Sequence, residues 1–213
     1  MDQSLLKLAT LGQLKRAGYF GKPVRMEMRE NLLGLLRAKQ RILPGIVGYD
    51  ETVLPEIENG VLAGHHMIFL GERGQAKSRL IRALALLMDE YVPAVANCEI
   101  NDDPHAPICA RCKRLATERG DELPISWIGR EQRYSEKLAT PDVSVADLIG
   151  EIDPIKVAEG RYLADVETIH YGLIPRTNRG IFAINELPDL AERIQVGLLN
   201  VLEERDIQIR GHR

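Results

Sequence analysis

The stretch Met67-Ile68-Phe69-Leu70-Gly71-Glu72-Arg73-Gly74-Gln75-Ala76-Lys77-Ser78 sets the expectation for the rest of the chain. A short apolar run leads into a glycine-containing loop, and Lys77-Ser78 then opens a helical pattern. This is the order of strand, loop and helix in a phosphate-binding P-loop (Walker A), whose usual pattern is G-x-x-x-x-G-K-[ST]. The stretch departs from that pattern at one position, because Ala76 stands in place of the second glycine.

The residue types of the loop suit the phosphates of a nucleotide. Its backbone N–H groups can surround the β- and γ-phosphates, and the helix that follows points its positive N-terminal end at them. We expect Lys77 to contact the phosphates and the Ser78 hydroxyl to ligate Mg²⁺. The alternative is a glycine turn before an ordinary helix, with Lys77 in solvent. The predicted nucleotide contacts in the loop are Gly71, Glu72, Arg73, Gly74, Gln75, Ala76, Lys77 and Ser78.

A second apolar run, Gly180-Ile181-Phe182-Ala183-Ile184, has the continuous apolar character of a buried parallel strand. It ends in Asn185-Glu186, where a P-loop NTPase carries a Walker B element: an Asp that holds Mg²⁺ and a Glu that orients the attacking water. Glu186 is therefore the candidate catalytic residue. Asn185 replaces the Asp; it can accept a hydrogen bond from a metal-bound water but brings no negative charge. A strand that merely ends in polar residues is the alternative.

Hydrophobic periodicity places helices around these two motifs. Apolar residues recur at helical spacing in residues 26–39, 51–62, 78 to just before Pro93, and 187–202. We expect strands at 66–70, 124–128 and 180–184, and the start of another at 206–213. Because strands alternate with helices, the sequence predicts an α/β fold of the P-loop NTPase class, with a parallel sheet flanked by helices.

The bulk composition is that of an ordinary soluble globular protein, with 45% apolar and 28% charged residues among 213. No apolar run is long enough to span a bilayer and the N-terminus lacks a signal-peptide pattern, so we expect a cytoplasmic protein without a membrane partner. A net charge of −3 argues against nucleic acid as a partner. Residues 14–41 are nevertheless basic, with eight Lys or Arg against two Glu. Contact with nucleic acid or with an acidic neighbouring subunit would explain that segment, and a solvated helix face explains it at least as well.

Four segments, in a familiar order, resemble the AAA+ ATPases of the magnesium chelatase I-subunit and MoxR branch. They are Ile46-Val47-Gly48-Tyr49, the P-loop, Gly150-Glu151-Ile152-Asp153 and the stretch from Gly172 to Ile181. The resemblance implies that Ile46, Val47, Gly48 and Tyr49 line an adenine pocket and that residues 151–175 are an insert in helix 2. It also implies hexameric homo-oligomeric rings, with ATP sites between subunits. It covers residues 42–213, a partial AAA+ nucleotide-binding domain, and leaves 1–41 as a basic helical segment.

Two features bear on hydrolysis. The departures Ala76 and Asn185 are compatible with a slow ATPase, with a protein that binds nucleotide without turnover, or with a tolerated variant set. The resemblance further implies a sensor strand, an arginine finger and a helical lid after residue 213. We therefore expect an incomplete AAA+ core, the N-terminal part of a longer protein, and no hydrolysis by these residues alone.

The segment 97–123 is polar, rich in turns and contains all three cysteines. Cys98, His105, Cys109 and Cys112 follow the spacing C-x₆-H-x₃-C-x₂-C, and three thiolates with one imidazole can form a closed tetrahedral zinc site. The sequence thus suggests a zinc-binding insert. Reduced cysteines without a metal, or a ligand set completed by Asp102 or Asp103, are the alternatives.

The leading functional hypothesis is an ATP-dependent ring motor, which remodels an unidentified protein partner or drives metal insertion as magnesium chelatase does. A nucleotide-sensing regulatory module, which binds ATP and switches partners with little or no hydrolysis, is the alternative that Ala76 and Asn185 favour. An enhancer-binding transcriptional activator ranks last, because its G-A-F-T-G-A loop is absent from the sequence.

Overall fold

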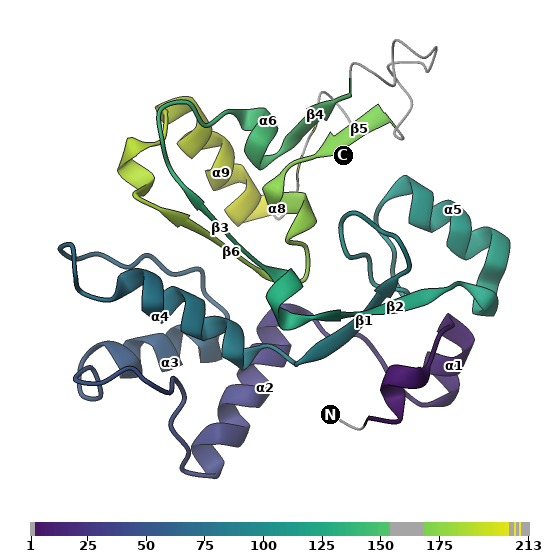
Figure 1. Ribbon diagram of the computed structural model, residues 1–213, viewed down its shortest axis with the longest axis horizontal. Coiled ribbons are helices and arrows are strands. Elements are labelled where there is room, and N and C mark those ends of the chain that lie inside the picture. Colours follow the sequence, from purple (N-terminus) through teal and green to yellow (C-terminus); the bar gives the residue numbers. More distant parts are fainter. Residues whose placement is uncertain (1–2, 154–167, 205–206, 208, 210–213) are drawn as a thin grey trace.

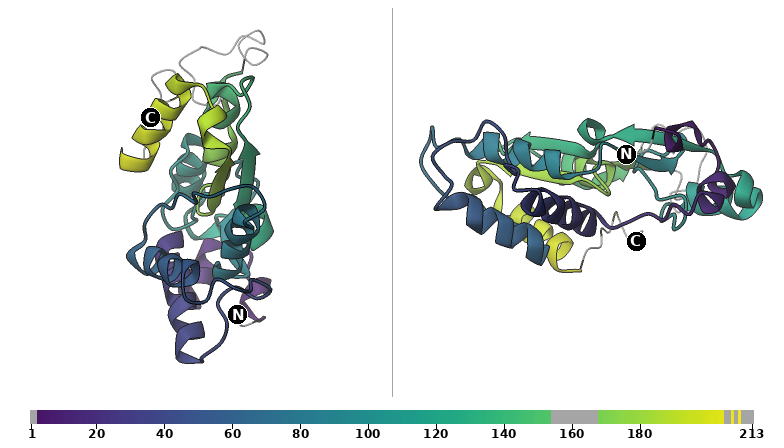
Figure 2. Two further views of the ribbon diagram at one scale, coloured as in Figure 1. Left: turned by 90° about the vertical axis from the view of Figure 1, so that its left-hand side faces the viewer. Right: turned by 90° about the horizontal axis from the view of Figure 1, so that it is seen from below.

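The computed structural model describes residues 3–153, 168–204, 207 and 209. The chain is an α/β protein, flattened in one direction (Figures 1 and 2). Its α-helices are α1 (Leu11–Arg16), α2 (Val24–Arg37), α3 (Val53–Ala63), α4 (Lys77–Leu84), α5 (Ala110–Arg119), α6 (Val145–Leu148), α8 (Leu173–Arg176) and α9 (Glu192–Glu204). Its strands are β1 (Tyr91–Val95), β2 (Ile125–Gly129), β3 (Tyr134–Leu138), β4 (Gly150–Ile152), β5 (Ile169–Tyr171) and β6 (Ile181–Asn185). Short 3₁₀ turns are η1 (Leu5–Lys7), η2 (Ala85–Leu87), η3 (Gly120–Glu122), η4 (Arg130–Arg133) and η6 (Leu187–Asp189).

The strands pair two by two. β3 and β6 run parallel, from Tyr134 opposite Ile181 to Leu138 opposite Asn185. β1 and β2 are antiparallel, as are β4 and β5. In both views of Figure 2, α2, α3 and α9 lie to one side of the β3–β6 pair. The parallel pair with helices against it is the arrangement that the sequence predicts.

The largest core lies among α2, α3 and α4. Its buried members are Met28, Leu32, Ile42, Leu43, Ile46, Leu54, Ile57, Val61, Leu80, Leu84, Leu87 and Met88. Helix α3 ends at Gly64, whose φ of 67° places it in the left-handed conformation that terminates many helices. Tyr134 and Ile181 pack against this core, so β3 and β6 begin on it.

A second core supports the far end of the parallel pair. Phe182 and Ile184 of β6 pack on a buried cluster of Ala139, Val143, Leu148, Leu190 and Ile194. The cluster joins β6 to α6 and to the start of α9, which cover that end in Figure 1. β6 is thus held by side chains on both halves of its length.

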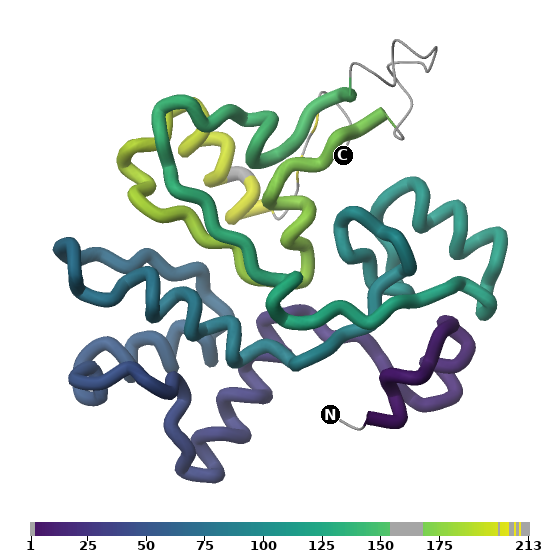
Figure 3. Tube along the Cα trace, in the orientation of Figure 1, coloured from purple at the N-terminus to yellow at the C-terminus, as the bar shows by residue number. Residues whose placement is uncertain are grey.

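A third, smaller core joins the N-terminus to the cysteine segment. Leu11, Val95, Cys112 and Leu123 form its buried part. Residues 9–11 lie beside 123–125, because Leu11 N donates to Leu123 O at 3.0 Å and Ile125 N donates to Ala9 O at 2.9 Å. Figure 3 shows the two traces next to each other. α1 therefore packs on segment 97–123, while α2 packs on α3.

A buried ion pair links these regions. Both side chains are almost fully enclosed, with Glu27 of α2 3% exposed and Arg133 of η4 1% exposed. Arg133 Nη1 and Nη2 donate to the two Glu27 carboxylate oxygens at 2.8 and 2.7 Å. Arg133 Nε and Nη2 also donate to Arg179 O at 2.8 and 2.6 Å. The pair fixes α2 to both β3 and the turn that precedes β6.

Several sequence predictions are confirmed: the helices at 26–39 and 51–62, the start of a helix at Lys77-Ser78, and the strands at 124–128 and 180–184. The helix predicted from Ser78 to just before Pro93 is wrong at its end, because α4 stops at Leu84, the 3₁₀ turn η2 follows, and β1 begins at Tyr91. The helix after Glu186 begins later than expected, at Glu192, because Leu187–Asp189 form a 3₁₀ turn. Among the described residues no helix is long and apolar enough to cross a membrane. The strand predicted at 206–213 falls almost entirely outside the described residues, as do residues 154–167 of the predicted 151–175 insert.

The prediction of a strand at 66–70 is wrong. These residues adopt no regular structure, and the side chains of Ile68 and Leu70 are exposed. A strand needs a neighbouring strand to accept its hydrogen bonds. Here β3 and β6 pair with each other and not with residues 66–70. β1, β3, β4 and β5 are strands that the sequence pattern did not predict. β1 contains the buried Pro93, which is tolerated because, among the described residues, β1 pairs with β2 alone.

Candidate nucleotide site and cysteine cluster

The predicted P-loop leads directly into α4, which begins at Lys77 as the sequence predicts. Ala76 has a φ of 57° and caps the helix in the left-handed conformation, which suits glycine better than alanine. Gly74 has a φ of 85° and makes the preceding turn without steric cost. Both Gly74 and Ala76 thus have a positive φ, and Ala76 adopts it with some strain.

The side chains of the loop close it on itself. Lys77 Nζ donates to the carbonyl oxygens of Gly71 and Glu72, at 2.6 Å each. Glu72 N donates to Gln75 Oε1 at 3.0 Å. Ser78 is half-buried in the first turn of α4. The cation of Lys77 thus lies over the loop, where its hydrogen bonds go to neutral oxygens.

The segment predicted to line an adenine pocket lies against this loop. Tyr49 Oη donates to Gln75 O at 3.0 Å, across 26 residues of sequence. Ile46 is buried in the core of α2, α3 and α4, while Val47 is 77% exposed. Gly48, at a φ of 87°, turns the chain between them and Tyr49. The structure brings residues 46–49 and the P-loop together, with one apolar side chain open to solvent.

The predicted Walker B residues stand at the carboxyl end of β6. Asn185 is the last residue of β6 and is half-buried, and Ala139 N donates to its carbonyl oxygen at 2.8 Å. Glu186 follows in the left-handed conformation, with a φ of 56°, and its side chain is exposed. The carboxyl end of β6 and the first turn of α4 both lie on the left-hand side of Figure 1.

An ion pair that sequence reasoning missed attaches α4 to β3. Arg82 Nε donates to Glu136 Oε2 at 2.8 Å, and Tyr134 Oη donates to the same oxygen at 2.7 Å. The Arg82 guanidinium lowers the pKa of Glu136 to about 2. Arg82 lies one turn after the loop. Its partner Glu136 belongs to β3, so the i, i+4 pattern of charges along α4 does not reveal the pair. The contact fixes α4, and with it the P-loop, against the parallel pair.

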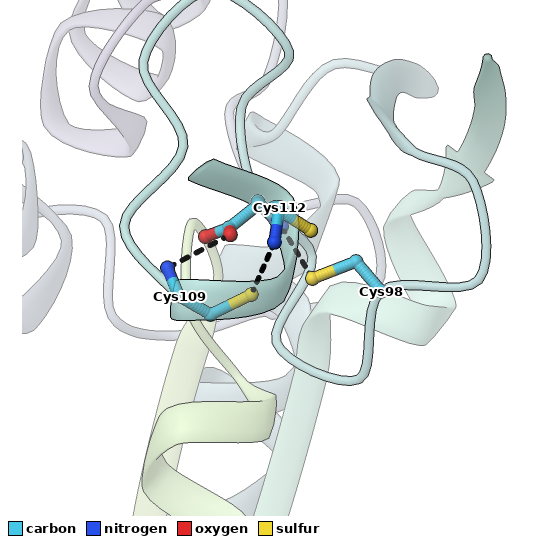
Figure 4. Close-up of side chains that lie close together, drawn as sticks. Cys98, Cys109 and Cys112 are labelled. Atoms are coloured by element: carbon cyan, nitrogen blue, oxygen red, sulfur yellow. Dashed lines mark hydrogen bonds between the residues drawn. The ribbon is translucent and has the colours of Figure 1, made fainter. Parts of the chain in front are cut away.

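The three cysteines of segment 97–123 lie together. One ligand atom each from Cys98, Asp102, Cys109 and Cys112 forms a group in which all four atoms are within 4.8 Å of one another. Figure 4 shows the three sulfur atoms turned toward one another. His105, which the spacing suggested as the fourth ligand, is outside this group. Its Nδ1 lies 3.3 Å from Asp103 Oδ1, and its ring is 5.9 Å from that of Phe20. Asp102 takes its place.

Helix α5 explains the arrangement. Cys109 is its N-cap, and Cys112 N donates to Cys109 Sγ at 3.3 Å. Asp102 N donates to Cys98 Sγ at 3.4 Å, and Cys109 N donates to Asp102 Oδ2 at 3.0 Å. The segment is thus not merely a polar loop, since it contains a helix that seats two cysteines on its first turn.

The thiols differ in acidity within this group. A hydrogen bond from the Cys109 thiol lowers the pKa of Cys98 to about 6, while donating that bond raises the pKa of Cys109. Burial raises the pKa of Cys112 to about 12. Cys98 is therefore the thiol that most readily carries a negative charge.

The chain resembles subunits of magnesium chelatase. It is 32% identical over 187 residues to magnesium-chelatase subunit ChlI of Nostoc sp., a match that covers 81% of this chain and 47% of that protein. It is 32% identical over 164 residues to the chloroplastic ChlI subunit of Chlamydomonas reinhardtii, covering 73% and 36% of the two chains. The chain spans less than half the length of these curated relatives. No family model matches it.

A solved structure shares the fold. It is a complex between subunits BchI and BchD of magnesium chelatase, based on a single-particle cryo-electron microscopy reconstruction. The TM-score is 0.52 at 24% sequence identity, and the match covers 73% of this chain and 44% of the other. The fold that the sequence predicts, an α/β core with parallel strands flanked by helices, is confirmed by this likeness.

Proposed function

We propose that this chain, which belongs to the magnesium-chelatase I-subunit branch of the AAA+ ATPases, binds ATP and Mg²⁺ at residues 46–49, 71–78 and 185–186. The observation that carries the proposal is the hydrogen bond from Tyr49 Oη to Gln75 O at 3.0 Å. It joins the predicted adenine segment to the predicted phosphate loop, two stretches that the sequence could only relate by resemblance.

Lys77 and Ser78 have the chemistry that phosphate and Mg²⁺ require. Lys77 Nζ now contacts two neutral carbonyl oxygens. Exchanging them for phosphate oxygens would replace neutral acceptors with charged ones, which form stronger hydrogen bonds. Ser78 lies in the first turn of α4 and would hold Mg²⁺ through its hydroxyl. Mg²⁺ held by these residues would supply positive charge that offsets the negative charge of the phosphates.

Asn185 and Glu186 would complete the site from the end of β6. The side chain of Glu186 is exposed, which suits a residue that must orient a water molecule. Asn185 would accept a hydrogen bond from a metal-bound water and would leave the Mg²⁺ charge less well compensated than an Asp does. Slow hydrolysis is the expected consequence.

The whole protein would act as a homo-oligomeric ring in the cytoplasm, a hexamer with ATP sites between subunits. The relatives are named as magnesium-chelatase subunits, and the similar structure is a complex of two kinds of subunit. By that likeness the ring would drive metal chelation or remodel a partner protein. A second kind of subunit is the expected protein partner.

Replacement of Lys77 by alanine tests nucleotide binding. We expect Lys77→Ala to weaken the Kd for Mg·ATP at least about tenfold, because a hydrogen bond to a charged group contributes about 1.5–3 kcal/mol. Lys113→Ala, which removes an exposed lysine from α5, is the matched control and should leave the Kd unchanged. Titration calorimetry measures both. Equal affinities of the Lys77 and Lys113 variants would refute the proposal.

A nucleotide sensor with little hydrolysis is the second candidate, which the uncharged Asn185 favours. Steady-state ATPase rates of the full-length protein separate it from the motor. For a motor we expect Glu186→Gln to lower kcat by about 100-fold or more while ATP still binds. Identical rates for the wild type and the Glu186 variant would leave the sensor as the function.

A further inference from the structure

We propose that Cys98, Asp102, Cys109 and Cys112 form a structural zinc site that holds the turn before β6 in place. The ligand set differs from the one that the cysteine and histidine spacing suggests, because a buried carboxylate replaces His105. The proposal goes beyond nucleotide binding and does not depend on it.

The geometry of the four ligand atoms fits one tetrahedral ion. Their separations are all within 4.8 Å. Two thiolates on one zinc, each at about 2.3 Å, lie about 3.8 Å apart, and a thiolate and a carboxylate oxygen at about 2.0 Å lie about 3.5 Å apart. No pair in the group therefore needs to approach by more than about 1.3 Å. Three thiolates favour zinc over Mg²⁺, which takes oxygen ligands. No other part of the described chain brings three such side chains together in this way.

Asp102 supplies an independent sign of a bound cation. Its side chain is fully buried, and Oδ1 has no hydrogen-bond partner among the described residues. Oδ2 already accepts from Cys109 N. A buried carboxylate oxygen without a partner is costly, and a cation would remove that cost. The unpaired oxygen belongs to the residue that completes the tetrahedron.

The sulfur atoms already accept hydrogen bonds, as metal-bound thiolates do. Asp102 N donates to Cys98 Sγ, and Cys112 N donates to Cys109 Sγ. Arg111 Nη1 lies 3.9 Å from Cys112 Sγ and places a positive charge beside the group. These donors would offset the excess negative charge of three thiolates and one carboxylate around a divalent ion.

The site is connected to the strand that ends in Asn185. Asn178 Nδ2 donates to Ile100 O, and Asn101 Nδ2 donates to Arg176 O, both at 3.0 Å. Arg179 Nη1 donates to Asn101 O at 3.3 Å. Residues 100 and 101 lie between the first two ligands of the set, so zinc would fix the loop against which the turn at 176–179 rests. The metal would thereby help to position β6.

Metal analysis of the purified chain, after removal of any affinity tag, tests the site. We expect one zinc per chain. Competition with a chelator should show Asp102→Asn to weaken zinc binding at least about tenfold, since loss of an outer-shell partner alone typically costs 10- to 100-fold. The amide oxygen of that variant could still accept from Cys109 N, so the substitution keeps this hydrogen bond. His105→Asn is the matched control and should retain the wild-type affinity.

Cobalt substitution provides a second readout that a folding defect cannot imitate. The wild-type chain should show intense tetrahedral d–d bands with thiolate-to-cobalt charge transfer, and Cys112→Ser should lose part of the charge transfer. Absence of zinc, with three freely titrating thiols or with a disulfide, would overturn the proposal. An affinity that falls on His105→Asn but not on Asp102→Asn would overturn the ligand set. Neither result bears on ATP binding, which Lys77→Ala tests separately.

Discussion

Ala76 combines a side chain and a backbone conformation that rarely occur together. Its φ of 57° is left-handed, and a residue with a Cβ loses about 1–2 kcal/mol there. Glycine would avoid that strain but has a more flexible unfolded state, which costs about 0.5–1 kcal/mol. The two effects nearly cancel, which explains how alanine is tolerated at this position before α4.

Ala76→Gly should therefore not destabilise the protein. We expect the free energy of unfolding to stay the same or to rise by up to about 1 kcal/mol, as the difference between these two effects. Ala83→Gly, inside α4, should instead lose about 1 kcal/mol. Urea denaturation of both variants measures the contrast. A loss at Ala76 as large as that at Ala83 would show that its backbone is unstrained.

Among the elements, β6 depends most on a close approach of backbone to backbone. A Cβ built on Gly180 would lie 1.9 Å from Arg133 O, a separation that no packing adjustment of side chains can relieve. Arg179, just before it, is left-handed, with a φ of 61°, and its guanidinium donates to Pro93 O at 2.7 Å. The turn thus places β6 beside β3 only because residue 180 has no side chain.

Gly180→Ala should destabilise the protein by about 2 kcal/mol or more, because the new methyl group forces the turn away from Arg133. Gly197→Ala is the matched control: it lies inside α9 with nothing within 4 Å of the added Cβ. That substitution should stabilise the protein by up to about 1 kcal/mol. Thermal unfolding of both variants distinguishes them. Similar melting temperatures would mean that the turn before β6 is not constrained as described.

At the scale of the whole molecule, the Glu27–Arg133 pair ties together parts of the chain that are 106 residues apart. Both partners are buried, and Asp89 N also donates to Glu27 Oε1, at 2.5 Å. Removing one partner leaves the other charged and buried, whereas removing both does not. The pair therefore specifies how α2 meets the parallel strands more than it adds net stability.

Glu27→Gln should cost about 3–5 kcal/mol, because it leaves Arg133 buried without its counter-charge. Replacing both residues by methionine should cost much less than the sum of the costs of Glu27→Met and Arg133→Met. A double-mutant cycle of these variants measures the coupling free energy. Lys15→Ala, which breaks the exposed pair with Asp121, is the control and should cost less than about 1 kcal/mol. Equal losses at the buried and exposed pairs would contradict this account.

Features that depend on short stretches of chain could be predicted from the amino-acid sequence. The turn before α4, the start of α4 at Lys77 and the polar end of β6 are local patterns, since a helix and a turn make their hydrogen bonds between near neighbours. The α/β class and the relation to AAA+ proteins followed from the order of those patterns. Their existence was therefore predictable, although the exact start of α9 was not.

Features that depend on contacts between residues distant in sequence were decided only by the tertiary structure. An apolar run becomes a strand only where a neighbour accepts its hydrogen bonds, so 66–70 stayed irregular while β3, with no strong sequence pattern, paired with β6. The same holds for the cysteine cluster. Spacing along the chain favoured His105, but the path of the loop into α5 turned Asp102 toward the three sulfur atoms. Residue spacing measures distance along the chain, whereas ligation depends on distance in space.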